Sequence, residues 1–327
     1  MRAVRSFLVV LPILGFIGWL SAAPAREVGL DALDSSETTQ QVARSNHDIA
    51  ASPNRINELS RPSREMPHPV IRLAENDPSG DSGNPTIAPL KWAGLVVNYE
   101  MFEKDVRKVP GACTGQFIAP RVVLTAAHCV QDRKTGAWYD LKKMYFLLQY
   151  QNKSFSQSYQ AICASRFDGW WPAQLRSPNT EERNRAEQNR WQWDYAMILV
   201  DRSSTTGHYQ KPKFDWQQGR YPHATATGYP VAMLGGQIIQ IADGDIFFPN
   251  FRIPNIVALR HNSADLTRGS SGGAWVAYFD KGEDGEYNTV IAVTSFIDKS
   301  QPGVSFGPYL TSAFYRLLDY VSKGCSR

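Results

Sequence analysis

Aromatic residues are confined almost entirely to one part of this chain. Of its 38 Phe, Tyr and Trp residues, 35 lie between residues 87 and 327, and none lies between residues 26 and 86. Aromatic side chains supply much of the area that a folded core buries, so the segment 26–86 is not expected to build a core. The sequence therefore predicts a globular region at 87–327, preceded by a disordered leader or pro-segment.

The first 25 residues have the layout of a secretory signal peptide. Two arginines precede an apolar run at 7–20, and the small residues Ala23-Pro24-Ala25 follow it. The run is shorter than the roughly 20 apolar residues that a membrane-spanning helix needs, and small residues of this kind precede the signal-peptidase cut. We expect a secreted or periplasmic protein that is not stably inserted in a membrane once residues 1–25 are removed. An uncleaved N-terminal anchor is the alternative.

Charge and cysteine content narrow the function classes. The chain has 35 basic and 31 acidic residues, and the basic residues are dispersed along the sequence, so a nucleic-acid partner is not expected. Four cysteines are too few for a small disulfide-built scaffold but suit two bridges in an exported domain. They are Cys113, Cys129, Cys163 and Cys325.

Residues 87–327 consist mainly of short apolar segments separated by Gly, Pro, Asn and Asp. Examples lie at 94–97, 122–124, 144–148, 197–200, 238–241 and 289–293. Strands of this length and spacing are typical of an all-β sandwich or barrel. One helix is expected near the C-terminus, because apolar residues recur there at helical spacing. They are Phe314, Leu317, Leu318 and Val321.

A histidine and an aspartate each stand at the end of an apolar strand. His128 follows the apolar run at 122–124 and two small alanines, and an imidazole can act as a general base near neutral pH. Asp194 precedes the apolar run at 196–200, where a buried carboxylate needs a hydrogen-bond donor such as an imidazole N–H. Taken alone, each residue is more often structural, the histidine in a core and the aspartate in a turn.

A glycine-rich turn presents a serine. In Gly269-Ser270-Ser271-Gly272-Gly273, the glycines allow a tight turn, expose a hydroxyl and let backbone N–H groups converge where a negative oxygen can form. A Gly/Ser loop without chemistry is the alternative. The immediate return to the apolar run at 274–278 favours a rigidly anchored turn.

The three motifs, in the order His128, Asp194, Ser271, resemble those of the trypsin/chymotrypsin-like serine proteases. Gly228-Tyr229-Pro230 and the polar leader are more similar to the bacterial glutamyl-endopeptidase-like branch. The resemblance implies an all-β fold of two six-stranded antiparallel Greek-key barrels with a C-terminal helix. The active site would lie between the barrels.

The signal-peptide layout, the absence of aromatic residues at 26–86 and the resemblance over 87–327 together divide the chain into four parts. The signal peptide at 1–25 and the leader at 26–86 precede an N-terminal barrel at 87–210, which would carry His128 and Asp194. The C-terminal barrel at 211–327 would carry Ser271 and the C-terminal helix.

The same resemblance assigns roles to individual residues. Ser271 would be the nucleophile, His128 the general base and acid, and Asp194 the carboxylate that orients the imidazole. The amides of Gly269 and Ser271 would form the oxyanion hole; choosing Ser270 as nucleophile would shift the glycine pattern by one. The implied protein is a monomeric secreted serine endopeptidase that needs no cofactor and cleaves protein or peptide substrates through an acyl-enzyme. Two alternatives stay open: an inactive protease-like binding module, and an esterase with the same triad.

Ser270 departs from the animal enzymes of this family. Those enzymes carry an aspartate before the nucleophile, which pairs with a newly cut N-terminus. Ser270 has no charge for that ion pair, so activation by terminal insertion is not expected. In a zymogen of this chain, removal of the leader at 26–86 would act by uncovering the site.

The residues for substrate preference follow from the resemblance as well. Asp265 lies six residues before Ser271, where the family's pocket for Arg or Lys carries its carboxylate; the alternative is that Asp265 only caps the loop. Ser295 and Phe296 would form the pocket wall, and the bulk of Ile297 would narrow the entrance. The glutamyl branch has a histidine in this strand, and its absence here counts against a preference for acidic residues.

The segment between His128 and Asp194 is longer than the family needs, and the excess lies at 163–193. This insertion carries four tryptophans, which either pack beneath a loop or form an exosite. They are Trp170, Trp171, Trp191 and Trp193.

A bridge between Cys113 and Cys129 would hold the histidine turn against the preceding strand. Cys163 and Cys325 then remain, and export favours their pairing.

No metal site is expected, because the remaining histidines show no ligand spacing. They are His208, His223 and His261.

Overall fold

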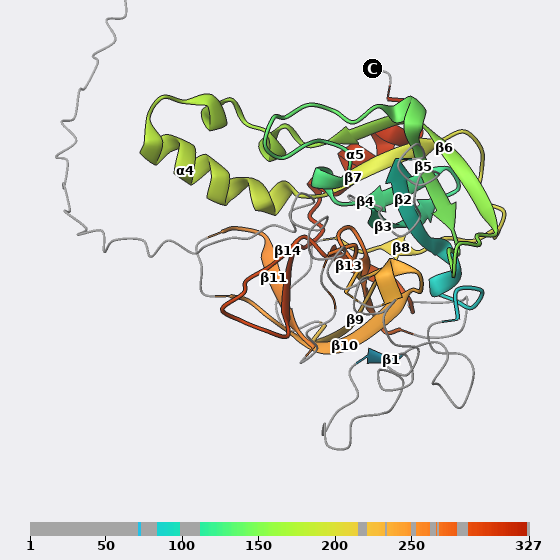
Figure 1. Ribbon diagram of the computed structural model, residues 1–327. Coiled ribbons are helices and arrows are strands. Elements are labelled where there is room, and N and C mark those ends of the chain that lie inside the picture. The colour runs from blue at the N-terminus through green and yellow to red at the C-terminus, as the bar shows by residue number, and fades with distance from the viewer. Residues whose placement is uncertain are drawn as a thin grey trace, which may run out of the picture.

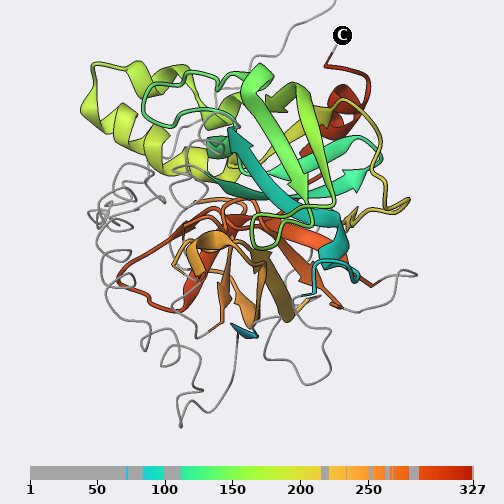
Figure 2. The same ribbon diagram turned by 45° about the vertical axis from the view of Figure 1, so that its right-hand side comes forward.

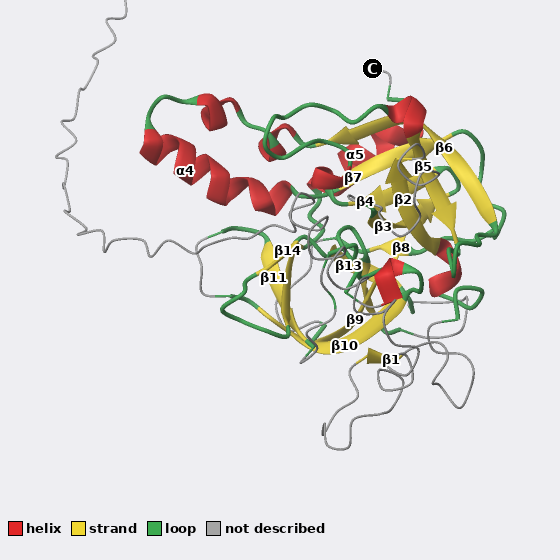
Figure 3. Cartoon of the chain, in the orientation of Figure 1, coloured by secondary structure: helices red, strands yellow, loops and turns green. Residues whose placement is uncertain are grey.

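The computed structural model describes residues 71–72, 84–98, 112–214, 221–232, 234–249, 253–261, 266, 268–279 and 287–325. Two β-rich regions lie one against the other, and the helices stand at their periphery (Figures 1, 2 and 3). The predicted signal peptide, most of the predicted leader, and Asp265 fall outside the described residues. Within them, no helix is both long enough and apolar enough to cross a membrane.

The first region is a closed barrel of six antiparallel strands in the order β2-β3-β4-β7-β6-β5. Its strands are β2 (Ala93–Asn98), β3 (Cys113–Ala119), β4 (Val122–Thr125), β5 (Met144–Leu148), β6 (Gln157–Arg166) and β7 (Ala196–Val200). Phe117, Phe146 and Tyr159 fill its interior, with the Phe117 ring meeting the other two nearly edge-on at 5.2 and 5.1 Å. The predicted six-stranded antiparallel barrel is confirmed for this region.

The second region is an open sheet of nine strands, so the prediction of a second closed six-stranded barrel is wrong. Eight of the strands form the path β14-β15-β11-β10-β9-β12-β13-β8, and β1 pairs with β10 off that path. The sheet is mixed, because β8 runs parallel to β13. Its strands are β1 (Ile71–Arg72), β8 (Lys211–Pro212), β9 (His223–Gly228), β10 (Gln240–Phe247), β11 (Ile256–Arg260), β12 (Ala274–Ala277), β13 (Thr289–Val293), β14 (Phe296–Ile297) and β15 (Val304–Pro308).

The open sheet comes close to closing at a single point. Ala292 of β13 forms one isolated antiparallel bridge with Tyr309, just beyond β15. Beside this bridge Leu310 N–H donates to Ile291 O, and beyond β13 the chain turns, with Thr294 N–H donating to Gly273 O and Ser295 N–H to Phe306 O of β15.

The C-terminal helix α5 (Ala313–Ser322) confirms the predicted helix. Phe314, Leu317 and Val321 form its buried face, as the spacing predicts. They pack with residues of β4 and β7, so the helix covers the first barrel although it follows the last strand of the second region.

From residue 168 onward the insertion between His128 and Asp194 forms helices, whereas residues 163–166 belong to β6. The insertion contains η6 (Asp168–Trp170), η7 (Ala173–Arg176), α4 (Thr180–Asn189) and η8 (Arg190–Trp193). The Asn179 side chain accepts hydrogen bonds from the amides of Glu181 and Glu182 and so caps the start of α4. In Figure 1, α4 extends to the left of both β regions. The remaining short 3-10 helices are η2 (Leu90–Trp92), η4 (Ala127–Cys129), η5 (Leu141–Lys143) and η9 (Leu234–Gly236).

Candidate active site

The pairing of β4 with β7 brings His128 and Asp194 together. These strands are antiparallel, with Thr125 opposite Ala196, so the residues just after β4 lie beside the residues just before β7. Ala126 and Ala127 are fully buried, and their small side chains let the turn that carries His128 lie close to Asp194.

Three hydrogen bonds hold the Asp194 carboxylate, which is fully buried. His128 Nδ1–H donates to Oδ2 at 2.8 Å, and the His128 backbone N–H donates to Oδ1 at 2.9 Å. Ser295 Oγ also donates to Oδ2. A buried carboxylate is stable only when it is paired in this way, and the pairing leaves Nε2 of His128 as the acceptor on the far side of the ring.

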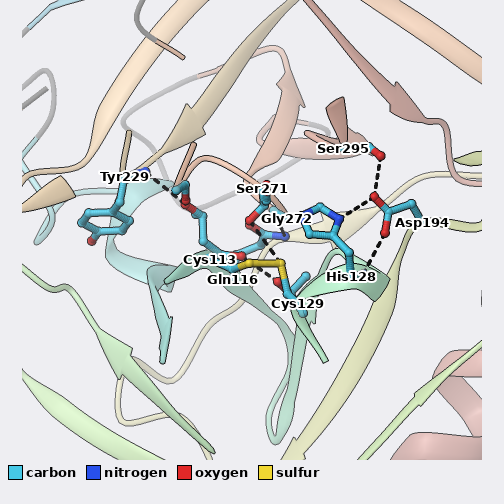
Figure 4. Close-up of a disulfide and its surroundings, with 12 residues drawn as sticks. Cys113, Gln116, His128, Cys129, Asp194, Tyr229, Ser271, Gly272 and Ser295 are labelled. Atoms are coloured by element: carbon cyan, nitrogen blue, oxygen red, sulfur yellow. Dashed lines mark hydrogen bonds and ion pairs between the residues drawn. A yellow bond between two sulfur atoms is a disulfide. The ribbon is translucent and has the colours of Figure 1, made fainter. Parts of the chain in front are cut away.

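Ser271 lies on that far side of the imidazole, opposite Asp194 (Figure 4). Its carbonyl oxygen accepts a hydrogen bond from Thr114 N–H at 2.8 Å and lies 3.9 Å from Cys129 Sγ. Cys129 directly follows His128 in η4. The structure therefore brings His128, Asp194 and Ser271 into one site at the junction of the two β regions.

The backbone N–H groups of Gly269 and Ser271 are oriented by hydrogen bonds to the carbonyl oxygens of the same peptide units. Arg268 O accepts from Val231 N–H at 2.6 Å, and Ser270 O accepts from Gly273 N–H at 2.9 Å. Because N–H and C=O point in opposite directions in a trans peptide, the amides of Gly269 and Ser271 point away from these partners. Neither amide donates to another of the described residues, so both can receive a negative oxygen.

Gly269 is required at its position on steric grounds. Its φ of +92° lies in the left-handed region, and an added Cβ would stand 2.2 Å from Tyr229 O. Any side chain would therefore displace the peptide whose N–H is a predicted oxyanion donor.

Thr114 and Gln116 of β3 hold this loop from the other region, and the sequence reasoning missed both. Thr114 Oγ1 donates to Gly269 O at 2.8 Å and accepts from Tyr229 N–H at 3.0 Å. Gln116 Nε2 donates to Gly272 O at 3.1 Å, and its Oε1 accepts from Ala274 N–H at 3.0 Å. The sequence held a signal, since Thr114 and Gln116 are polar residues at alternate positions of an otherwise apolar segment. In the structure both are fully buried.

Ser270 and Ser271 lie in different surroundings. Ser270 is fully buried beside Gly228, where an added Cβ would be 2.7 Å from Ser270 Cβ. Its hydroxyl has no hydrogen-bond partner among the described residues. Ser271 is also buried, and it faces the His128 imidazole in Figure 4.

The residues predicted to form the pocket wall contact other parts of the protein. Ser295 bonds to Asp194. Phe296 is fully buried, with its ring stacked on Phe306 at 5.2 Å and lying 5.1 Å from Trp191. Ile297 is half-buried opposite Ser305 of β15.

The histidines predicted to lie outside the site occur both on the surface and in the core. His208 and His223 are exposed, and His223 Nδ1 lies 2.6 Å from Asp245 Oδ1. His261 is buried, and its Nε2 shares a hydrogen bond of 2.9 Å with Ser305 Oγ. Burial lowers the pKa of His261 to about 4, so this imidazole is neutral at neutral pH.

Both cysteine pairs form disulfides. Cys113–Cys129 ties β3 to the turn of His128, and Cys163–Cys325 ties β6 to the end of α5. The two sulfurs of the first bridge and a ring nitrogen of His128 lie within 4.8 Å of one another. A metal would need these sulfurs as thiolates, and the disulfide occupies them.

Neither a protein-family model nor a curated protein matches the chain. Among solved structures, a Glu endopeptidase matches with a TM-score of 0.56 and 15% identity, over 78% of this chain and 98% of that one. The protease Anisep from Arthrobacter nicotinovorans matches with a TM-score of 0.50 and 18% identity, over 72% and 96%. An inactivated protease paralogue of the scabies mite matches with a TM-score of 0.51 and 15% identity, over 72% and 96%. These likenesses show a shared fold, and the inactivated paralogue shows that this fold occurs without activity.

Proposed function

We propose that this chain, which has the fold of the trypsin-like serine proteases, is an exported serine endopeptidase that acts through Ser271, His128 and Asp194. The observation that carries the proposal is the buried Asp194 carboxylate, which bonds both the ring and the backbone of His128 beside the Ser271 loop. The glutamyl-endopeptidase-like branch remains the branch that the sequence motifs favour.

The geometry supports an acyl-enzyme mechanism. The Ser271 hydroxyl attacks the scissile carbonyl carbon while its proton moves to Nε2 of His128. The carbonyl oxygen becomes negative and is stabilised by the amides of Gly269 and Ser271. His128 then gives the proton to the leaving amine, and a water molecule repeats the sequence to release the acid. Asp194 keeps the imidazole in one orientation and stabilises its charged form throughout.

Export is part of the proposal. The signal-peptide layout of residues 1–25 and the two disulfides both suit an oxidising compartment outside the cytoplasm. The substrates would be proteins or peptides, taken without a cofactor. The uncharged, buried Ser270 supports activation that does not depend on an ion pair with a new N-terminus.

Labelling with a fluorophosphonate tests the proposal. We expect covalent modification of the purified protein, mapped by mass spectrometry to Ser271, with Ser271→Ala unlabelled and Ser270→Ala still labelled. A folded wild-type protein that is not labelled would support the alternative of an inactive binding module. Turnover of an ester without turnover of the matching peptide would favour the esterase.

The leader is tested separately. Deletion of residues 26–86, with the same signal peptide and folding conditions, is expected to raise activity if the leader covers the site. Equal activity of the two forms would show that the leader has no inhibitory role.

A further inference from the structure

Arg190 is a buried cation at the base of the insertion. It is the first residue of η8, lies four residues before Asp194, and its side chain is only 2% exposed. Its guanidinium carbon lies 4.6 Å from the ring centroid of Trp170, 5.4 Å from that of Trp171 and 5.5 Å from that of Trp191. Three of the four tryptophans that mark the insertion therefore surround one guanidinium.

This cluster reaches the candidate triad at two points. The Trp170 ring centroid lies 6.3 Å from that of His128, and Trp170 and Trp191 meet edge to face at 5.5 Å. The backbone N–H of Asp194 donates to Trp191 O at 3.2 Å. Trp170 therefore packs near the His128 imidazole. The hydrogen bond to Trp191 O holds the backbone of Asp194 in place.

The cluster also reaches the second β region. Trp191 contacts Phe296 of β14, which directly follows Ser295, the residue whose hydroxyl bonds to Asp194. In addition, Asn255 Nδ2 donates to Gln192 Oε1 at 3.2 Å. The base of the insertion therefore bridges the two regions that supply the triad.

The guanidinium has few polar partners for a buried cation. Its Nη2 donates to Glu187 Oε1 at 2.7 Å and its Nη1 to Arg133 O at 3.0 Å. Its Nε has no partner among the described residues. Burial lowers the pKa of Arg190, and Glu187 acts in the opposite direction. A buried cation is costly, and a planar guanidinium that stacks on indoles is a group that lysine cannot replace.

We propose that Arg190 is a positioning residue of the reaction: by holding Trp170 and Trp191, it fixes the His128 ring and the Asp194 backbone relative to β14. The inference rests on the proposed function. It assigns the four-tryptophan insertion to support of the triad, and not to an exosite.

Paired variants test this role. Arg190→Met keeps a similar volume without the charge, and Arg190→Lys keeps the charge without the planar fork. We expect both to lower kcat about ten- to a hundredfold with KM changed less than threefold, because small misplacements of catalytic groups cost rate more than binding. Arg185→Met is the matched control, since Arg185 lies on α4 with its side chain 70% exposed, and it should leave kcat unchanged.

Chemical rescue separates positioning from stability alone. Adding ethylguanidinium to Arg190→Ala is expected to restore part of kcat, with no effect on the wild-type protein or on Arg185→Met. Absence of rescue, unchanged kcat in Arg190→Met, or unfolding of every Arg190 variant at a temperature where Arg185→Met stays folded would each overturn the inference.

Wild-type labelling by the fluorophosphonate is measured first. Labelling with equal rates in all Arg190 variants overturns this inference alone, whereas no labelling of the wild type overturns the proposed function and this inference with it.

Discussion

The two β regions hold the candidate triad by different means. His128 and Asp194 stand at the ends of β4 and β7, which pair directly in a closed barrel. Ser271 lies in the loop before β12 of an open sheet, and Thr114 and Gln116 hold that loop from the other region. A strand ladder thus brings two of the three residues together, whereas the third is held by hydrogen bonds across the junction, from the Thr114 backbone N–H to Ser271 O and from the side chains of Thr114 and Gln116.

The largest loss of kcat is expected from a change in the His128–Asp194 pair, which the pairing of β4 with β7 positions. Asp194→Asn should lower kcat about 10⁴-fold, because the amide can stabilise neither the required tautomer nor the imidazolium. Ser295→Ala removes only one of the three hydrogen bonds to Asp194 and should cost much less. Steady-state kinetics on one peptide substrate measure both. A loss below tenfold in Asp194→Asn would contradict the role given to this carboxylate.

Removal of each disulfide in turn should distinguish a bridge that supports stability alone from one that supports both stability and activity. Removing Cys163–Cys325 by double serine substitution is expected to lower the free energy of unfolding by about 2–5 kcal/mol. Because this bridge joins β6 to the end of α5, kcat should not change at a temperature where the variant is folded. Removing Cys113–Cys129, which lies against Ser271 O, should lower both. Chemical denaturation and kinetics measured on the same samples provide the check, and equal kcat losses in the two variants would break the distinction.

Acid should destabilise the second region through His261. The pKa of this imidazole is about 4 in the folded protein, against about 6.5 when unfolded. Well above pH 6.5 the imidazole is neutral in both states and has no effect on stability. As the pH falls from 6.5 to 4, the unfolded state takes up the proton first, so about 3 kcal/mol of stability is lost.

Replacing His261 isolates this contribution. His261→Gln keeps a hydrogen-bonding partner for Ser305 and removes the titration, so denaturation curves at pH 7 and pH 4.5 should differ less than those of the wild type. The same pH dependence in both proteins would show that other groups control acid stability.

The smallest effect is expected from substitution of Thr114, which holds the Ser271 loop from the first β region. Thr114→Val leaves Gly269 O and Tyr229 N–H without their side-chain partner, at a cost of about 1–3 kcal/mol, and we expect kcat to fall up to about a hundredfold. Thr114→Ser should retain most of the activity, because it keeps the hydroxyl. Thr227→Val, which loses a buried hydrogen bond of 3.3 Å to Ala274 O, is the control and should change stability more than kcat. Equal kcat values for Thr114→Val and Thr114→Ser would count against the hydrogen bond.

Local sequence was sufficient for features that depend on neighbouring residues. The helical spacing of Phe314, Leu317 and Val321 predicted α5 and its buried face. The motifs of His128, Asp194 and Ser271 singled out the side chains that the structure gathers. Each of these signals lies within about ten residues of sequence, where backbone geometry sets the periodicity.

The features that were missed depend on distant residues. The sequence does not show that the second sheet stays open, since the pairing of its strands joins residues far apart along the chain. It marks four tryptophans in the insertion without showing that three of them surround Arg190.

What the sequence determined by itself is where a core can form, which residue types could carry the chemistry, and their order along the chain. The tertiary structure alone decided that Thr114 would hold Gly269, 155 residues away, and that Arg190 would lie between the triad and β14. The physical reason is that a hydrogen bond or a ring contact acts only over a few ångströms. Which distant groups come that close is settled by how the two β regions pack, and no local pattern of residues records it.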